Sequence, residues 1–166
     1  MLRALRRFAQ LPHQRKVLLL EACVALASAA FRVQRIPFRQ LARRLGTSGC
    51  ESPQELPDAQ DQIAREVEWA LVALSRRLAR ILPRPPTCLM LASAGQTLLR
   101  RRRVPATVYL GVGSEAPTDG RTFDAHAWLR CGTRIVTGKA EAARFKPLAW
   151  FSTGTLNYER GNIHVP

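Results

Sequence analysis

The sequence is poor in the residues that build metal and redox sites. Its 166 residues include only four cysteines and three histidines. No two cysteines form a C-x-x-C pair, so the spacing typical of zinc sites and thioredoxin-type redox sites is missing. The motif G-x-x-x-x-G-K-[ST] is missing as well, which removes the signature of a nucleotide-binding P-loop. We therefore expect no metal and no cofactor.

Acidic residues are also scarce. There are 12 Asp and Glu against 26 Lys and Arg, which gives a net charge of +14 and a sequence pI near 11.4. Such an excess permits a nucleic acid, an anionic lipid surface or an acidic peptide as partner. The arginines are scattered over expected helix faces, and no base-reading motif accompanies them. We expect no nucleic-acid partner. A basic helical protein that binds nucleic acid is kept as an alternative interpretation.

A long uninterrupted apolar run is missing too. The segment QRKVLLLEACVALASAAF at 14–31 follows a basic start and imitates a secretion signal, but Glu21 interrupts it. The run is also too short to span a bilayer. We interpret it as a buried helix of a cytoplasmic protein without a membrane span.

What is present predicts an ordered domain, because hydrophobic residues make up 46% of the chain. Periodic apolar residues and their Pro and Gly boundaries predict helices. These cover 14–31, a short segment in PFRQLARRLG ended by Gly46, 58–82 with Asp58 as N-cap, and 88–102. Residues 47–57 read as a surface loop.

After Pro105 the pattern changes to one typical of strands. The expected strands are ATVYLGV, FDAHAWLRC and RIVTG, followed by a short helix or turn at 140–151. GSEAPTDG, between the first two, is an expected loop. Helices followed by antiparallel strands predict an α+β fold. We expect an N-terminal helical region at 1–82 and a core at 83–166, in which the cysteine helix packs on the sheet.

Cys88 is the first candidate for chemistry, because it opens a helix directly after Thr87, a natural N-cap. The first-turn N–H groups of a helix have no intrahelical partner, and their partial positive charge favours the thiolate form of a cysteine placed there. The same groups can stabilise an oxyanion that forms beside the sulfur. A buried structural cysteine is the alternative.

His126 is the candidate base, in the middle of the strand FDAHAWLRC. On a strand Asp124, His126 and Trp128 share one face, because side chains alternate between the two faces. Small apolar residues occupy the other face. An ordinary surface histidine on a strand is the alternative.

These segments together resemble a known family. TCL at a helix start, LLRRRRVPATVYLGV, AHAW and RFKPLAWF are similar, in this order, to the transglutaminase-like cysteine peptidases of lasso-peptide biosynthesis. The leading helices, including IPFRQLARRLG, are similar as well. Members of that family remove the leader from a ribosomally made precursor, so that a cyclase can close the macrolactam. The resemblance implies a transglutaminase or papain-like core and a leader peptidase, a hydrolase of the cysteine protease class.

The resemblance also implies roles for residues. Cys88 would be the nucleophile and His126 the general base and then acid. The family's third member is an acid shortly after the histidine, but here Thr137, Gly138 and Lys139 occupy that segment. Glu141 is the nearest acid downstream, and Asp124 is the alternative. We prefer Glu141, because an Asp on the same strand usually points alongside the histidine; a carbonyl or amide could also orient the ring.

Partners follow from the same resemblance. They are the precursor peptide, a separate PqqD-like protein that recognises the leader, and the ATP-dependent lasso cyclase. A fused PqqD-like domain would bring strands, and residues 1–80 read as almost entirely helical. The arginines at 100–103 could dock an acidic leader or complement the helix dipole. The competing interpretation is a catalytically idle transglutaminase-fold protein that binds peptide or a partner without cutting it.

Overall fold

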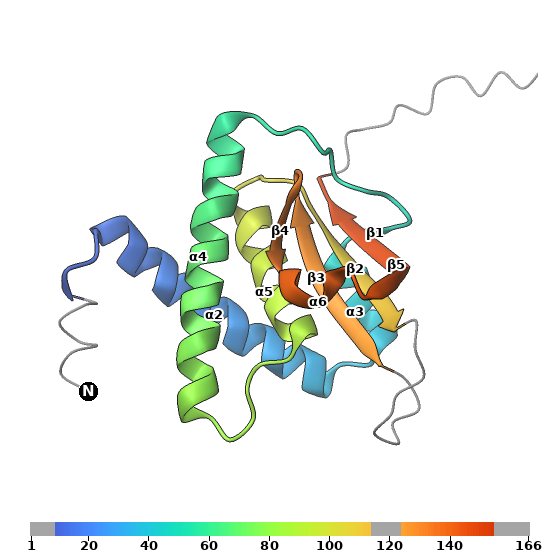
Figure 1. Cartoon of the computed structure of the whole chain (residues 1–166), viewed down its shortest axis with the longest axis horizontal. Coiled ribbons are helices and arrows are strands. Elements are labelled where there is room, and N and C mark those ends of the chain that lie inside the picture. The colour runs from blue at the N-terminus through green and yellow to red at the C-terminus, as the bar shows by residue number, and fades with distance from the viewer. Residues whose placement is uncertain (1–8, 114–123, 155–166) are drawn as a thin grey trace, which may run out of the picture.

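We describe the fold from a computed structural model, which describes residues 9–113 and 124–154. Most of the expected loop GSEAPTDG lies outside these residues. Helices come first and strands follow, so the α+β class is confirmed (Figure 1). The helices are α2 (His13–Arg35), α3 (Phe38–Leu45), α4 (Asp58–Ile81), α5 (Cys88–Arg101) and α6 (Lys139–Ala142). The strands are β1 (Thr47–Ser48), β2 (Ala106–Gly113), β3 (Ala125–Cys131), β4 (Arg134–Thr137) and β5 (Phe145–Thr153).

The start of α4 differs from the expectation, because Asp58 is not its N-cap. Pro57 occupies that position in an extended conformation, and no side chain caps the helix. The Pro57 carbonyl accepts hydrogen bonds from the N–H groups of Gln60 and Asp61. Asp58 and Asp61 lie in the first turn instead, where the helix dipole favours negative charge. The proline thus shifts the helix start by one residue relative to an aspartate cap.

The prediction of a short helix or turn at 140–151 is right only at its start, because α6 ends at Ala142. After α6 the chain forms β5, a strand of nine residues. The sheet order is β1-β5-β2-β3-β4, and all neighbours are antiparallel, so β5 pairs on both sides. Proline is disfavoured inside strands because it has no backbone N–H to donate. Pro147 lies beside the register shift between β2 and β5, where the absence of this hydrogen bond costs least.

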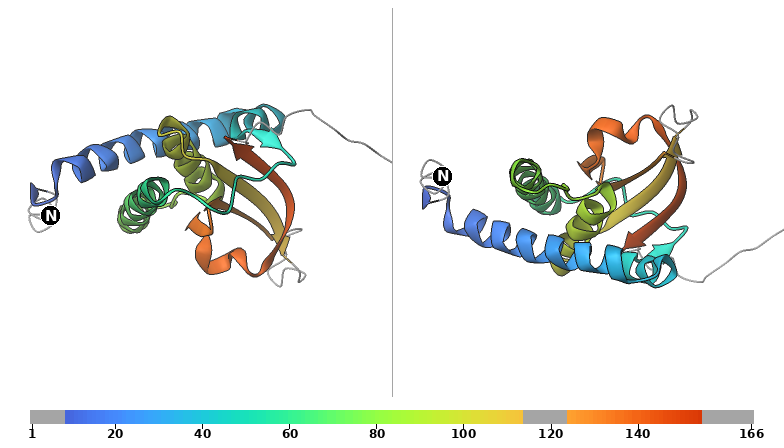
Figure 2. Two further views of the ribbon diagram at one scale, coloured as in Figure 1. Left: turned by 90° about the horizontal axis from the view of Figure 1, so that it is seen from above. Right: turned by 90° about the horizontal axis from the view of Figure 1, so that it is seen from below.

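The two faces of the sheet carry different clusters. On β3, Ala127, Leu129 and Cys131 belong to the main core together with the buried residues of the long helices. Trp128 alternates to the other face and packs with Tyr109, Ala142 and Phe145. Helix α5 contacts α2, α4 and the sheet, and lies among them (Figure 2). The core therefore lies between the sheet and three helices, and the small α6 covers part of the opposite face (Figure 1).

Close backbone packing fixes α3 against the sheet. Gly46 ends this helix, as the sequence predicts, with a φ of 123°. A Cβ at this position would lie 2.1 Å from the Ser152 carbonyl oxygen of β5. The contact needs glycine for both reasons, conformation and space. It places the arginines of α3 beside the C-terminal half of α5.

Helix α2 is, within residues 9–113 and 124–154, the one helix long and apolar enough to cross a membrane. A core helix of a soluble protein meets the same criteria. Here Ala22, Ala25 and Ala29 are buried against the domain, and Glu21 pairs with Arg102, the residue that follows α5. Packing and an ion pair thus join this helix to the rest of the fold.

Candidate active site

Cys88 lies at the first position of α5, where the sequence places it. The Thr87 hydroxyl accepts a hydrogen bond of 3.4 Å from the Met90 N–H, which confirms Thr87 as the N-cap. Pro85 and Pro86 separate this helix from α4. The thiol is half-buried, and the first-turn N–H groups of a helix start have no intrahelical acceptor. Their partial positive charge could stabilise an oxyanion that forms beside the sulfur.

His126 lies near the start of β3 and is only 7% exposed. Its Nε2 is 3.2 Å from the Gly138 carbonyl oxygen, and its Nδ1 is 3.3 Å from Oε2 of Glu141. Phe145 flanks the ring with its centroid 5.0 Å away. The structure thus brings His126 and Glu141 together, on the face of the sheet that α6 covers.

Both partners of the imidazole are hydrogen-bond acceptors. The two contacts can be hydrogen bonds at the same time only when both ring nitrogens carry a proton, which is the imidazolium form. In that form both ring protons are already donated to Gly138 and Glu141, so transfer of a proton to a leaving group requires the ring to leave this position. Glu141 is 58% exposed, so solvent screens its attraction to the ring.

Gly138 is what turns the chain over the imidazole. It follows β4 with a φ of 78°, in the left-handed region that glycine adopts most easily. A Cβ there would lie 2.8 Å from Nε2 of His126 and 2.9 Å from the Ala127 carbonyl oxygen. The turn starts α6 and carries Glu141 to the ring. The sequence pattern placed Gly138 at the end of the expected strand RIVTG and in the segment without an aspartate, but β4 ends at Thr137. A glycine directly after RIVT is a signal for such a turn.

Cys88 and the imidazole lie at the same end of the core. Gly95 of α5 faces Leu129 and Thr137, because its Cβ would approach both side chains. Cys88 is two helical turns earlier, so it lies on the same, sheet-facing side of α5. Figure 1 shows α5 and β3 beginning at the same end of the molecule.

The two groups are nevertheless not joined. Cys88 packs against the main core, whereas His126 alternates with Ala127 and projects from the other face. Among the described residues no hydrogen bond links the Cys88 sulfur to the ring of His126. The structure therefore assembles the histidine with its acid and leaves the thiol outside that pair.

The remaining predicted residues take other positions. Asp124 precedes β3 instead of lying on it, and its carbonyl accepts a hydrogen bond from Gly113. Of the three residues expected on this strand face, β3 itself carries His126 and Trp128. Cys23 is exposed on α2. Within the part of the chain that the structure describes, no three His, Cys, Asp or Glu side chains could hold a metal ion.

Cys131 shows the contrasting environment of a buried thiol. Its side chain is inaccessible to solvent and donates to the Pro105 carbonyl over 3.3 Å. Burial raises the pKa of this thiol to about 11, and Asp61 adds to the shift. Cys131 therefore stays protonated at neutral pH and is a structural cysteine.

Comparison with known families decides the class of the protein. The family model of the transglutaminase-like superfamily matches residues 23–149. The chain belongs to the transglutaminase-like superfamily. A cysteine helix packed on an antiparallel sheet agrees with the papain-like core of this superfamily, which includes cysteine proteases. Searches of curated proteins and of solved structures found no match.

The match extends across the expected boundary between residues 82 and 83. In the structure the main core joins buried residues of α2 and α4 with those of α5 and the sheet. The transglutaminase-like unit thus uses helices from both parts of the chain.

Proposed function

We propose that this transglutaminase-like protein is a cytoplasmic cysteine peptidase that removes the leader from a lasso-peptide precursor. The observation that carries the proposal is a superfamily match that includes Cys88, at a capped helix start, and His126, paired with Glu141. The segments TCL, VPAT and AHAW supply the finer likeness to leader peptidases. The partners would be the precursor, a separate PqqD-like recognition protein and the lasso cyclase.

The reaction would proceed through a thioester. The Cys88 thiolate attacks the carbonyl carbon at the junction of leader and core, and first-turn N–H groups hold the oxyanion. The His126 imidazolium donates its proton to the departing amine of the core, and the carbon–nitrogen bond breaks. The neutral imidazole then takes a proton from water, whose oxygen attacks the thioester. The leader leaves as a carboxylate, and the thiolate is restored.

This mechanism requires Cys88 and His126 to come within hydrogen-bond reach, about 2.6–3.2 Å between heavy atoms. Such contacts are often long or poorly aligned without substrate and tighten when substrate binds. Because His126 projects from the sheet face opposite to α5, the proposal requires a rearrangement of the start of β3 on peptide binding that carries the ring to the start of α5. The exposed Glu141 can follow a rotating imidazole more easily than a buried acid could.

A second candidate is an idle transglutaminase-fold protein that binds peptide or a partner without cutting. Two observations favour it. No hydrogen bond joins Cys88 to His126 within the described residues, and Lys139 stands in the segment where related peptidases carry an aspartate.

Cleavage of a precursor in the presence of its recognition protein, followed by mass spectrometry, separates the two candidates. We expect the wild type to release the core, and Cys88→Ala and His126→Ala to release none. Cys23→Ala, which removes an exposed cysteine of α2, is the matched control and should cut normally. Glu141→Gln should slow cleavage without abolishing it.

Alkylation with iodoacetamide between about pH 6 and 8 gives an independent measure of the thiol. A peptidase should show rapid modification of Cys88 and protection by the precursor. Precursor binding without cleavage, together with slow and unprotected alkylation, would establish the idle protein instead. Cleavage that persists in Cys88→Ala would refute the assigned nucleophile.

A further inference from the structure

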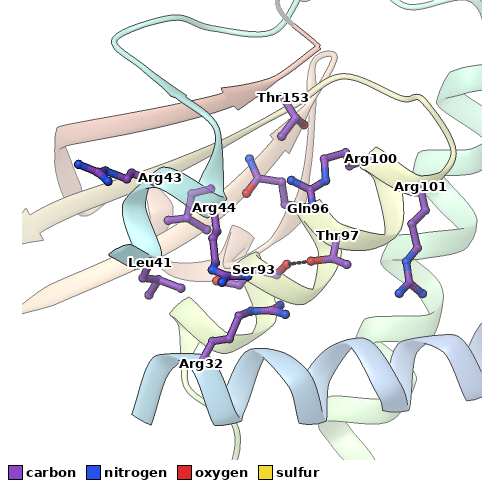
Figure 3. Close-up of a pocket in the computed structure, with 11 residues that line it drawn as sticks. Arg32, Leu41, Arg43, Arg44, Ser93, Gln96, Thr97, Arg100, Arg101 and Thr153 are labelled. Atoms are coloured by element: carbon purple, nitrogen blue, oxygen red, sulfur yellow. Dashed lines mark hydrogen bonds between the residues drawn. The ribbon is translucent and has the colours of Figure 1, made fainter. Parts of the chain in front are cut away.

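A cavity of about 400 Å³ lies between α2, α3 and the C-terminal half of α5 (Figure 3). It does not include Cys88 or His126. Its lining is dominated by side chains of these three helices, with Thr153 of β5 at one side: Arg32, Leu41, Arg43, Arg44, Leu45, Ser93, Gln96, Thr97, Arg100, Arg101 and Thr153. The volume falls within the usual range for small-molecule sites, about 300–1,000 Å³.

Five of the lining residues are arginines, and no lining residue is acidic. Arg32, Arg44 and Arg100 reach into the space from three helices, whereas Arg43 and Arg101 lie at its margins (Figure 3). We call the cavity lined by these five side chains the arginine pocket. They come from positions far apart in the sequence, so only the fold brings them together.

The arginines of the pocket have no acidic partner among the described residues. Arg15, Arg65, Arg102, Arg130 and Arg134 each form an ion pair with Asp or Glu. Exposed arginines such as Arg76 and Arg77 form none either, but they do not line this cavity. The pocket is distinguished by five arginines around one space with no acid in its lining.

The convergence has a measurable electrostatic consequence. Burial lowers the pKa of the Arg32 guanidinium, and the nearby charges of Arg44 and Arg100 lower it further. Like charges that share a partly desolvated cavity repel each other, and an anion in the cavity would relieve this repulsion.

A second observation points to a ligand at the same place. Ser93 lines the cavity, is only 3% exposed, and its hydroxyl has no hydrogen-bond partner within the described residues. A buried hydroxyl that lacks a hydrogen-bond partner destabilises the protein, because it has lost its bonds to water without replacing them. A hydroxyl can donate to an anionic oxygen, so this polar atom and the arginines call for the same kind of ligand.

We propose that the arginine pocket binds a small anion of the diphosphate class, either free or as part of a phosphorylated small molecule. Guanidinium groups match phosphate oxygens with two parallel hydrogen bonds. A diphosphate concentrates several charges within one compact group, which suits cations that converge from three sides. An acidic peptide spreads single charges along its backbone at about 3.3–3.6 Å per residue and needs a longer groove. The site is independent of the proposed peptidase chemistry.

Titration calorimetry with inorganic diphosphate tests the proposal. The pocket variant is Arg44→Gln with Arg100→Gln, and both of these side chains are exposed enough for the fold to tolerate the change. The matched control is Arg76→Gln with Arg77→Gln, two exposed arginines of α4 outside the cavity, which removes the same charge. We expect the pocket variant to bind diphosphate at least about 10-fold more weakly, and the control to bind like wild type. Circular dichroism verifies folding, and single Arg44→Gln is the substitute if the double variant fails to fold.

Titrations with three further ligands distinguish between the classes of ligand. Orthophosphate should bind more weakly than diphosphate, and ADP shows whether the pocket accepts a diphosphate that is part of a larger molecule. A hexaglutamate peptide should bind more weakly than diphosphate. The proposal is overturned if wild type binds no diphosphate, if control and pocket variants weaken equally, or if hexaglutamate binds more tightly than diphosphate.

Discussion

Gly138 stands where β4 ends and the chain turns over His126, so a single hydrogen at its Cα leaves room for the imidazole. Its neighbours on that side are the ring nitrogen of His126 and backbone and Cβ atoms of β3. The ring can rotate, but the backbone of the paired strand cannot give way easily. The geometry of the candidate site thus depends on the single residue Gly138.

We expect Gly138→Ala to destabilise the protein more than Gly49→Ala. The two glycines have φ values of 78° and 77°, so the cost of the left-handed conformation is the same in both variants. Only Gly138→Ala would also crowd its neighbours, since a Cβ at Gly49 would have no other atom within 4 Å. The difference in free energy of unfolding, measured in urea, should be roughly 1–3 kcal/mol. Equal losses of stability in the two variants would show that the turn accommodates a Cβ at Gly138 without crowding.

A second prediction at this scale concerns Cys131. Its pKa in the folded protein is about 11, above the ordinary thiol value of 9.0, because burial disfavours the thiolate. A raised pKa means that the unfolded chain loses its proton first, so this contribution to stability is complete below pH 9.0 and disappears as the pH rises to about 11. The free energy of unfolding should therefore fall over this window, and less steeply in Cys131→Ala.

Alkylation of the native protein checks the same environment. At pH 8 the exposed Cys23 and Cys50 should react quickly, and Cys131 should react only on the time scale of unfolding. Modification of Cys131 as fast as of Cys23 would contradict its burial.

Among the elements, α4 is tied to the edge strand β4 by charge. Arg134 of β4 contacts Asp61 over 3.2 Å and Glu68 over 3.3 Å, and both acids belong to α4. Hydrogen bonds from Arg65 and from Arg134 lower the pKa of Asp61 below its ordinary value of 3.8. A lowered carboxyl pKa contributes stability above pH 3.8, which is lost as the pH falls through the folded-state value.

We expect Asp61→Asn to lower the melting temperature slightly at neutral pH, and the difference from wild type to shrink as the pH falls through the folded-state pKa, which lies below 3.8. Asp58→Asn is the control, because Asp58 lies in the same first turn and shares its interaction with the helix dipole. Thermal unfolding followed by circular dichroism measures both variants. The same loss in both at neutral pH would attribute the effect of Asp61 to the dipole alone.

The elements also show which parts of the fold the sequence could predict. Helices α4 and α5 follow from apolar periodicity and from proline boundaries, and the position of Cys88 follows from its cap at Thr87. Strand β5 could not be predicted, because Pro147 and the helix-forming residues before it argue against a strand. Pairing with neighbours on both sides outweighs these local preferences.

The candidate site, too, could be predicted only in part from the sequence. Position within an element can be read from local sequence, whereas contacts depend on turns and on distant segments. The approach of Glu141 to His126 depends on the left-handed turn at Gly138, and the convergence of Arg32, Arg44 and Arg100 depends on the packing of three helices. Neither contact has a short-range signal.

For the whole molecule, the net charge of +14 makes the arginine pocket a source of instability. We expect Arg44→Gln with Arg100→Gln to raise the melting temperature of the ligand-free protein by roughly 1–3 °C at low salt, because repulsion of Arg32 disappears. Arg76→Gln with Arg77→Gln should raise it less. High salt should remove the difference by screening, and a pocket variant less stable than wild type would contradict the prediction.

The order of strands has a consequence for synthesis of the protein. The last strand in the described chain, β5, occupies an interior place in the sheet, between β1 and β2. Until residues 145–153 emerge from the ribosome, β1 and one edge of β2 have no pairing partner, although every helix from α2 to α5 has already been made. The nascent protein should therefore carry exposed strand edges until β5 has been made, and dilution or a chaperone that shields such edges should increase the folded yield.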